Sequence, residues 1–114
     1  MQKNPIVFNI TFKIGEDISD EWLKQMQTNY LPPCTDGQII VGSQINLIHV
    51  GQSEEDNDLT YAVQFTYLNE NLFELHKLTT MQKFLSLLDK NYRGKYVYFT
   101  TKMERLYYNS YINK

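Results

Sequence analysis

Apolar and polar side chains alternate along residues 6–14. The apolar positions are Ile6, Phe8, Ile10, Phe12 and Ile14, and between them stand Val7, Asn9, Thr11 and Lys13. Side chains of a β-strand point to opposite faces with a period of two. The pattern therefore predicts a strand with one apolar face in a core and a second face, mostly short and polar, that has another environment.

A stretch with helical spacing follows this strand. We expect Asp17 or Ser19 to cap the helix, and Asp20 and Glu21 in its first turn suit the positive end of the helix dipole. The apolar stripe of this helix comprises Ile18, Trp22, Met26 and Tyr30, with Leu23 alongside. Pro32-Pro33 is expected to end it, because proline cannot extend the hydrogen-bond ladder.

Two further strands are predicted in the middle of the chain. Residues 38–50 are rich in β-branched side chains, and Gly42-Ser43 within them indicates a bend or bulge. Residues 51–58 form a polar, acidic hairpin loop. Residues 59–67 then repeat the alternation of the first strand, with bulky side chains on one face and short ones on the other.

The last third of the chain predicts one helix and one strand. Asn69 is a plausible cap for a helix over residues 70–90, closed between Asn91 and Gly94. Its inner stripe is Phe73, Lys77, Met81, Phe84 and Leu88, broadened by Leu72, Leu85 and Leu87. Residues 95–103 are expected to form the fourth strand. The tail, residues 104–114, either prolongs that strand or packs on a partner.

The order βαββαβ predicts an α+β, ferredoxin-like sandwich in one domain over residues 1–114. Right-handed crossovers give an antiparallel sheet in the order 4-1-3-2. The first and third strands are then central neighbours, and the helices cover one face of the sheet. The other face stays wet or meets a second sheet.

The chain resembles an uncharacterised family of short bacterial proteins, a domain of unknown function, and more distantly the dimeric α+β barrel superfamily. The resemblance lies in residues 8–14, Trp22-Leu23, Met26, residues 30–32 and residues 60–65, and it extends over nearly the whole chain. Members of that family tend to have histidine where this chain has Tyr30, so no role of that histidine carries over. The resemblance implies a homodimer with two sheets face to face, and no established activity.

Composition narrows the classes of function. The formal net charge is −2, and no long run of Lys and Arg is present, so we expect no nucleic-acid partner. No segment approaches the ~18 continuous apolar residues of a membrane-spanning helix, and the N-terminus has no signal-peptide pattern. A single cysteine, Cys34, cannot form a disulfide within the chain. We expect a cytoplasmic protein without cofactor or membrane contact.

Two groups of residues are candidates for a functional surface. Asn9, Thr11, Gln64 and Thr66 share the open face of the predicted sheet. They form either the polar floor of a ligand site or a polar dimer interface, and short polar side chains suit close sheet packing. Trp22, Met26 and Tyr30 either line a pocket between the first helix and the sheet or belong to the core.

The remaining chemical groups point to structural roles. His49 is expected to be an exposed histidine beside the acidic loop, and His76 a partly buried structural one. Neither histidine has the spacing to Cys34 that a zinc site needs, so no metal is expected. Cys34 has no basic neighbour in sequence that would activate its thiol. The acidic loop lacks the glycine and the final glutamate of a calcium loop.

These observations favour a homodimeric structural or small-ligand-binding module. The alternative is a cofactor-free enzyme of the small oxygenase or isomerase kind, whose polar contact in the pocket is Tyr30, Trp22 or a histidine. A third interpretation is a regulatory subunit that joins a partner through its tyrosine-rich tail.

Overall fold

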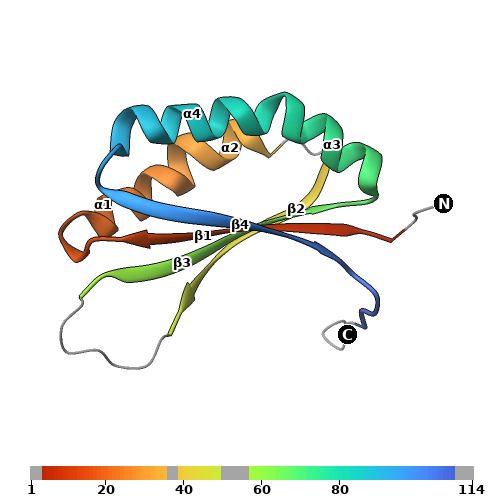
Figure 1. The fold of residues 1–114 in the computed structure, drawn as a ribbon, viewed down its shortest axis with the longest axis horizontal. Helices are drawn as coiled ribbons and strands as arrows, with labels where there is room; N and C mark the ends of the chain where they lie inside the picture. Colours follow the sequence, from red (N-terminus) through yellow and green to blue (C-terminus); the bar gives the residue numbers. More distant parts are fainter. Residues whose placement is uncertain (1–3, 36–38, 50–56, 110–114) are drawn as a thin grey trace.

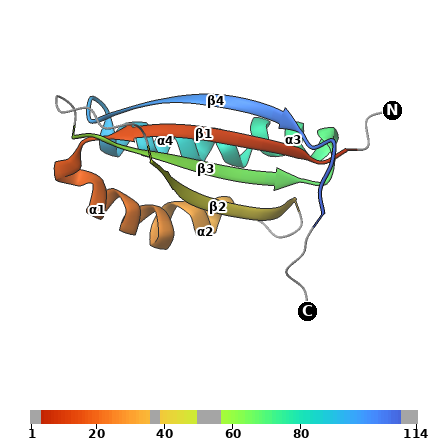
Figure 2. The ribbon, with the colours of Figure 1, turned by 90° about the horizontal axis from the view of Figure 1, so that it is seen from below.

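Strand β1 (Ile6–Ile14) lies inside a four-stranded sheet, between β3 (Leu59–Tyr67) and β4 (Tyr96–Glu104). Strand β2 (Ile40–Ile48) pairs with the other side of β3, so the sheet order is β2-β3-β1-β4 and every pair is antiparallel (Figure 2). The structure, a computed structural model, describes residues 4–35, 39–49 and 57–109. The predicted order 4-1-3-2 is confirmed.

The strand register places the apolar faces of β1 and β3 side by side. Ile10 is opposite Val63 and Phe12 is opposite Tyr61, and these four side chains are at most 5% exposed. The helices cover this face of the sheet and leave the other face open (Figure 1). Burial of the strand side chains against the helices therefore forms the core.

The first helical segment is longer and less regular than the sequence predicts. It consists of α1 (Glu16–Gln25), a π-helical turn η1 (Met26–Tyr30) and the short α2 (Leu31–Cys34). Gly15 holds the N-cap position without a side-chain cap, so the expected caps Asp17 and Ser19 are wrong. Both residues lie inside the helix, where the Ser19 hydroxyl donates to the Glu16 carbonyl.

Pro32-Pro33 does not end the helical segment, contrary to the sequence-based prediction. The Leu31 N–H bonds to the Met26 carbonyl, five residues back, and closes the π-turn. The two prolines then occupy the first turn of α2. An N–H group needs no partner within a helix at that position, so proline is tolerated there.

The second helical segment is broken in two, whereas the sequence predicts one helix over residues 70–90. The Asn69 side chain accepts a hydrogen bond from the Leu72 N–H and caps α3 (Glu70–Leu78) as predicted. Thr79 interrupts the helix with φ −122° and ψ −90°, and its hydroxyl donates to the Leu75 carbonyl. This kind of side-chain bond competes with the helical ladder. A new helix, α4 (Thr80–Tyr92), follows.

The break changes which residues of α3 face the core. Lys77, assigned to the inner stripe from a continuous helical period, is exposed, while His76 is fully buried. After the break, Met81, Phe84 and Leu88 of α4 are buried as predicted. A positive φ at Gly94 and a bond from the Lys95 N–H to the Tyr92 carbonyl then turn the chain into β4.

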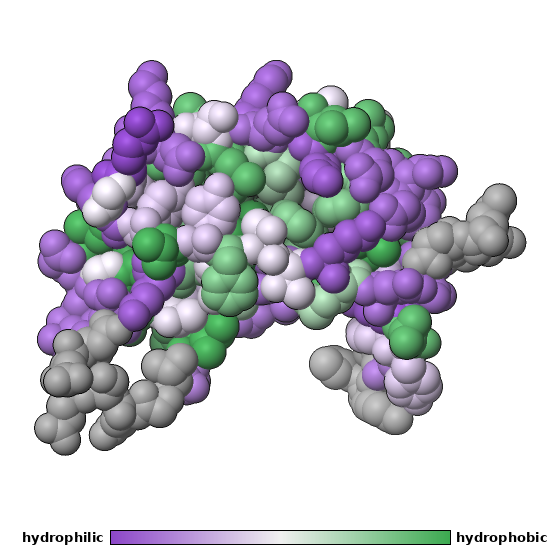
Figure 3. All heavy atoms as spheres, in the orientation of Figure 1, coloured by the Kyte–Doolittle hydropathy of each residue, from purple (hydrophilic) through white to green (hydrophobic). Residues whose placement is uncertain are grey.

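The bounds of β1 and β3 match the predicted ranges 6–14 and 59–67, whereas β2 is shorter than the predicted range 38–50 and β4 is shifted by one residue from 95–103. A register shift between Ile40 and Gly42 confirms the expected irregularity in β2. Beyond β4, residues 105–109 have no regular secondary structure and project on the side of the sheet away from the helices (Figure 1). Figure 3 shows this segment standing apart from the body of the molecule. Residues 50–56, which include most of the acidic loop, and residues 110–114 lie outside the described residues.

Candidate functional site

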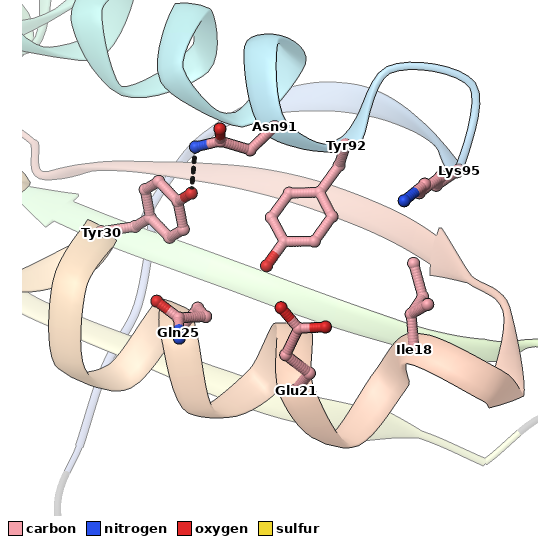
Figure 4. A pocket seen from close by; sticks show the side chains of 7 residues that line it. All are labelled: Ile18, Glu21, Gln25, Tyr30, Asn91, Tyr92 and Lys95. Carbon is pink, nitrogen blue, oxygen red and sulfur yellow. Dashed lines mark hydrogen bonds between the residues drawn. The ribbon is translucent and has the colours of Figure 1, made fainter.

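A cleft opens in the helix layer where α1 and η1 face the C-terminal end of α4 (Figure 4). Its volume is about 280 Å³. The lining residues are Ile18, Glu21 and Gln25 of α1, Tyr30 of η1, Asn91 and Tyr92 of α4, and Lys95 before β4. All of these except Ile18 carry a polar group, so the cleft can accommodate a small polar molecule.

Tyr30 is the residue of the predicted pocket that reaches this cleft. It ends the π-turn η1, and π-turns within α-helices occur often at functional sites because they redirect the side chains that follow. The Tyr30 hydroxyl accepts a hydrogen bond from Nδ2 of Asn91. Its own proton therefore stays available to a ligand.

Tyr92 supplies a buried ring and an unused hydroxyl. The residue is 6% exposed, and its ring centroid lies 6.3 Å from that of Tyr30. Within the described part of the chain its hydroxyl makes no hydrogen bond, and Figure 4 shows it directed towards Glu21. Burial, and then the neighbouring Tyr30 and Glu21, raise the pKa of Tyr92 above its ordinary value. At neutral pH this hydroxyl is a hydrogen-bond donor.

Trp22 and Met26, the other two residues of the predicted pocket, lie in the core. Both are fully buried, and the Trp22 ring lies 5.1 Å from Phe12 and 5.0 Å from Tyr61 between centroids. Among the described residues the Trp22 indole nitrogen has no hydrogen-bond partner. Neither residue lines the cleft. Their part in ligand binding stays a prediction.

The open face of the sheet is the second candidate surface (Figure 2). Asn9 is opposite Gln64 and Val7 is opposite Thr66, so the register brings the predicted polar face together on β1 and β3. Gln44 of β2 extends this polar row and donates from Nε2 to Oε1 of Gln64 at 3.1 Å. The role of these residues in a dimer stays a prediction.

Asn9 carries an unusual feature at the centre of this face. The residue is 9% exposed, and its Nδ2 donates to the Thr11 hydroxyl at 2.8 Å. Its Oδ1 is buried and has no hydrogen-bond partner within the described residues. A buried carbonyl without a donor costs roughly 1–3 kcal/mol. The Asn9 amide is therefore an incompletely satisfied polar group in the middle of the open face.

Exposed apolar side chains lie beside this polar row on the edge strand β4. Val97 is 65% exposed, Phe99 is 62% exposed and Met103 is 38% exposed. Their register partners are Lys13, Thr11 and Val7 of β1, which places all three on the open face. A groove of about 360 Å³ adjoins them, with Thr11, Val97 and Phe99 among its lining residues. This combination of apolar and polar groups is typical of a protein–protein contact.

A buried cluster that sequence reasoning did not assemble joins α2, α3 and β3. His76 is fully buried, not partly buried as expected, and its Nε2 lies 2.8 Å from the carbonyl oxygen of Cys34. A carbonyl only accepts, so Nε2 carries the proton and Nδ1 accepts from the Tyr67 hydroxyl, also at 2.8 Å. Contacts at both ring nitrogens thus fix the imidazole between α2 and β3.

The Cys34 thiol in this cluster is inert, as the sequence predicts. It is 2% exposed, and its Sγ lies 3.8 Å from Nε2 of His76. Burial raises the pKa of Cys34 from 9.0 to about 12, and burial together with Cys34 also raises the pKa of Tyr67. The thiolate is the nucleophilic form, so this group is a poor nucleophile at neutral pH.

The sequence carried a partial signal for two of the missed residues. His76 stands three positions after Phe73, so it falls on the core face once the helix is taken to end before Thr79. Asn91 belongs to residues 91–94, where the sequence predicts the end of the helix. No sequence signal pairs His76 with Cys34, because 42 residues separate them.

The other chemical groups add little to the site. His49 is exposed directly after β2, as expected, while Glu54 and Glu55 of the acidic loop lie outside the described residues. Over residues 4–35, 39–49 and 57–109, no three His, Cys, Asp or Glu side chains gather as a metal site would need. No helix in the same ranges is both long and apolar enough to cross a bilayer.

Comparison with known proteins shows the family and the fold. The family described as Domain of unknown function (DUF4286) matches residues 5–106. No curated protein matches the chain.

Two solved structures share the fold. A conserved protein of unknown function from Bacteroides thetaiotaomicron, described as a possible oxidoreductase, is similar with a TM-score of 0.57 and 12% identity, over 90% of this chain and 99% of its own. A dimeric ferredoxin-like protein from an uncultured marine organism is similar with a TM-score of 0.52 and 7% identity, over 92% of this chain and 99% of its own. The predicted ferredoxin-like fold is therefore confirmed.

The buried cluster predicts a specific loss of stability. Tyr67→Phe removes the hydroxyl that donates to Nδ1 of His76, and we expect the free energy of unfolding to fall by about 1–3 kcal/mol. Tyr61→Phe is the control: Tyr61 is similarly buried on the same strand, and its hydroxyl makes no hydrogen bond within the described residues. Urea denaturation measures both, and equal effects of the two substitutions would contradict the assignment.

Proposed function

This chain belongs to the family described as Domain of unknown function (DUF4286), and we propose that it is a homodimeric small-ligand-binding module. The open face of the sheet forms the dimer, and the cleft between α1 and α4 takes the ligand. In this proposal Tyr30 contacts the ligand. Trp22 and Met26 support it from the core.

Two features of the open face support the dimer. Asn9 and Gln64 belong to a row of short polar side chains that suits close sheet packing, and Phe99 and Val97 expose apolar surface beside it. A second copy placed face to face would cover this apolar surface. The dimeric ferredoxin-like protein that shares the fold also supports self-association.

The observation that carries ligand binding is the unused hydroxyl of Tyr92. It is held by a nearly buried ring, it faces the cleft, and it makes no hydrogen bond within the described residues. A donor fixed in this way is prepared to bind an acceptor, since the protein has already ordered the group. The Tyr30 hydroxyl, held by Asn91, offers a second such donor on the neighbouring wall.

The alternative function is a cofactor-free enzyme of the small oxygenase or isomerase kind. The observation that favours it is the proximity of Glu21 and Tyr92, which could act as a base and an acid. Glu21 is exposed, and no histidine lines the cleft. Binding without catalysis therefore fits this cleft better.

The dimer proposal predicts that a charge on the open face separates the protomers. Thr11→Glu places two like charges near the two-fold axis, and Phe99→Glu does so at a side chain that is 62% exposed in the protomer. We expect the wild type to sediment as a dimer at micromolar concentration and both variants as folded monomers. Phe99→Glu matters most, because an exposed side chain can be changed with little effect on the protomer.

Thr100→Glu is the matched control for both variants. Thr100 is exposed on β4, but its register partner Ile10 faces the helices, so the new charge lies on the opposite face. This variant should remain a dimer. A monomeric wild type, or dimeric Phe99→Glu protein, would contradict the face-to-face arrangement.

The ligand proposal predicts that the protein retains a small molecule when it is purified from its own cells under mild conditions. Native mass spectrometry should show a mass excess for the wild type. Tyr92→Phe, which removes the unused hydroxyl, should lower the bound fraction, while Tyr107→Phe in the exposed segment should not. Bare protein under all mild conditions, or equal occupancy in both variants, would count against the cleft as the site.

A further inference from the structure

The cleft between α1 and α4 contains two opposite charges that no ion pair engages within the described residues. The Glu21 carboxylate projects from α1, and the Lys95 ammonium projects from the turn before β4 (Figure 4). By contrast, Lys102 and Glu70 form an ion pair at 2.6 Å elsewhere on the surface. A ligand that carries both a negative and a positive charge would complement these two unpaired charges of the cleft.

The hydrogen bonds already made in the cleft determine which groups remain for a ligand. Gln25 accepts at Oε1 from Asn29, so its amide N–H groups remain available. Tyr30 accepts from Asn91, so its hydroxyl proton remains available. With the Tyr92 hydroxyl and the Lys95 ammonium, the cleft offers four donor groups.

Acceptors are fewer, and one of them, the Glu21 carboxylate, faces the Tyr92 hydroxyl (Figure 4). The Glu21 carboxylate is the anionic acceptor of the cleft, and Oδ1 of Asn91 is a neutral one, because its Nδ2 is used on Tyr30. Ile18 is the apolar lining residue. The donors therefore suit a carboxylate, and the Glu21 carboxylate suits an ammonium group, with little apolar surface for a long hydrocarbon chain.

We infer that the cleft binds a small amino-acid-like zwitterion, that is, a molecule with a free carboxylate and a free ammonium group. The inference rests on the proposed ligand-binding function and adds its chemical class. The ligand carboxylate pairs with Lys95, and the Tyr92 hydroxyl, which faces Glu21, lies beside the ammonium end of the ligand. The ligand ammonium pairs with Glu21. Charge-assisted hydrogen bonds of this kind give the binding its selectivity.

The test titrates defined probe molecules and measures the NMR signals of residues that line the cleft. The probes are the standard L-amino acids and 4-aminobutyrate, each titrated into the full-length protein while the backbone amide signals of Glu21, Tyr92 and Lys95 are followed by NMR. Calorimetry then gives the dissociation constant of the best probe, its N-acetyl derivative and its carboxamide. We expect each derivative to bind about tenfold to hundredfold more weakly, since each lacks one charge-assisted contact.

Variants connect each end of the ligand to its residue. Glu21→Gln should weaken binding of the free zwitterion about tenfold or more but leave the N-acetyl derivative unchanged, and Lys95→Met should behave in the same way towards the carboxamide. The control variants are Asp20→Asn and Lys24→Met. Each removes one charge of the same sign as Glu21 or Lys95, at an exposed position on α1 that does not line the cleft. These two controls should bind as the wild type does.

The outcomes separate the ligand class from the proposed function. If compounds with one charge or none bind as tightly as zwitterions and shift the same signals, the ligand class is wrong while the site stands. If zwitterions bind but Glu21→Gln and Lys95→Met have no effect, the pairing is wrong. If neither these probes nor extracts of the source cells shift any cleft signal, the proposed function fails together with the inference.

Discussion

Burial of one face of β1 and β3 against the helices is the interaction on which the rest of the structure depends. The side chains from Ile6 to Ile14 on that face, and their partners on β3, are at most 9% exposed apart from Leu59 at the strand end, which is partly buried. Burying one such side chain contributes roughly 1.5–3 kcal/mol. Because strand side chains alternate, the same register that completes the core also decides which residues lie on the open face.

That constraint has different consequences on the two layers. On the open face it places Asn9 in a row of amides and hydroxyls, with exposed apolar side chains on β4 at its edge. In the helix layer, packing against the sheet holds Trp22 and Met26 inward. The π-turn η1, which begins at Met26, then determines where Tyr30 lies. The cleft forms where this turn faces the end of α4, away from the sheet. The proposed dimer surface and the proposed ligand cleft therefore lie on opposite sides of the sheet.

The strands and their order could be predicted from the sequence because each depends on a local period. The alternation in residues 6–14 and 59–67, and the cap at Asn69, are readable without knowledge of distant contacts. The π-turn at Met26–Tyr30 and the break at Thr79 are not, because they arise from competition between a regular ladder and side-chain or tertiary contacts. That break turned His76 inward in place of Lys77.

The candidate site could be predicted less well than the fold. Tyr30 was identified, but its neighbours Asn91 and Tyr92 come from a helix about sixty residues further along the chain, and no local pattern links them. Cys34 and His76 are also far apart in the sequence, and only the packing of the complete fold brings them into contact. Strand periodicity alone assigns the polar residues of β1 and β3 to one face, and the register places them side by side. Their part in a dimer stays a prediction.

The most direct test of the central claim, that the open sheet face is the contact between two copies, is an isotope-filtered NMR experiment on mixed protomers. One half of the sample carries ¹³C and ¹⁵N labels and the other half carries none, so that only contacts between copies give signals. The account predicts such signals from the Asn9 side-chain amide and from Phe99 and Met103. Signals confined to residues of the helix layer, such as Leu75 and Leu87, would contradict it.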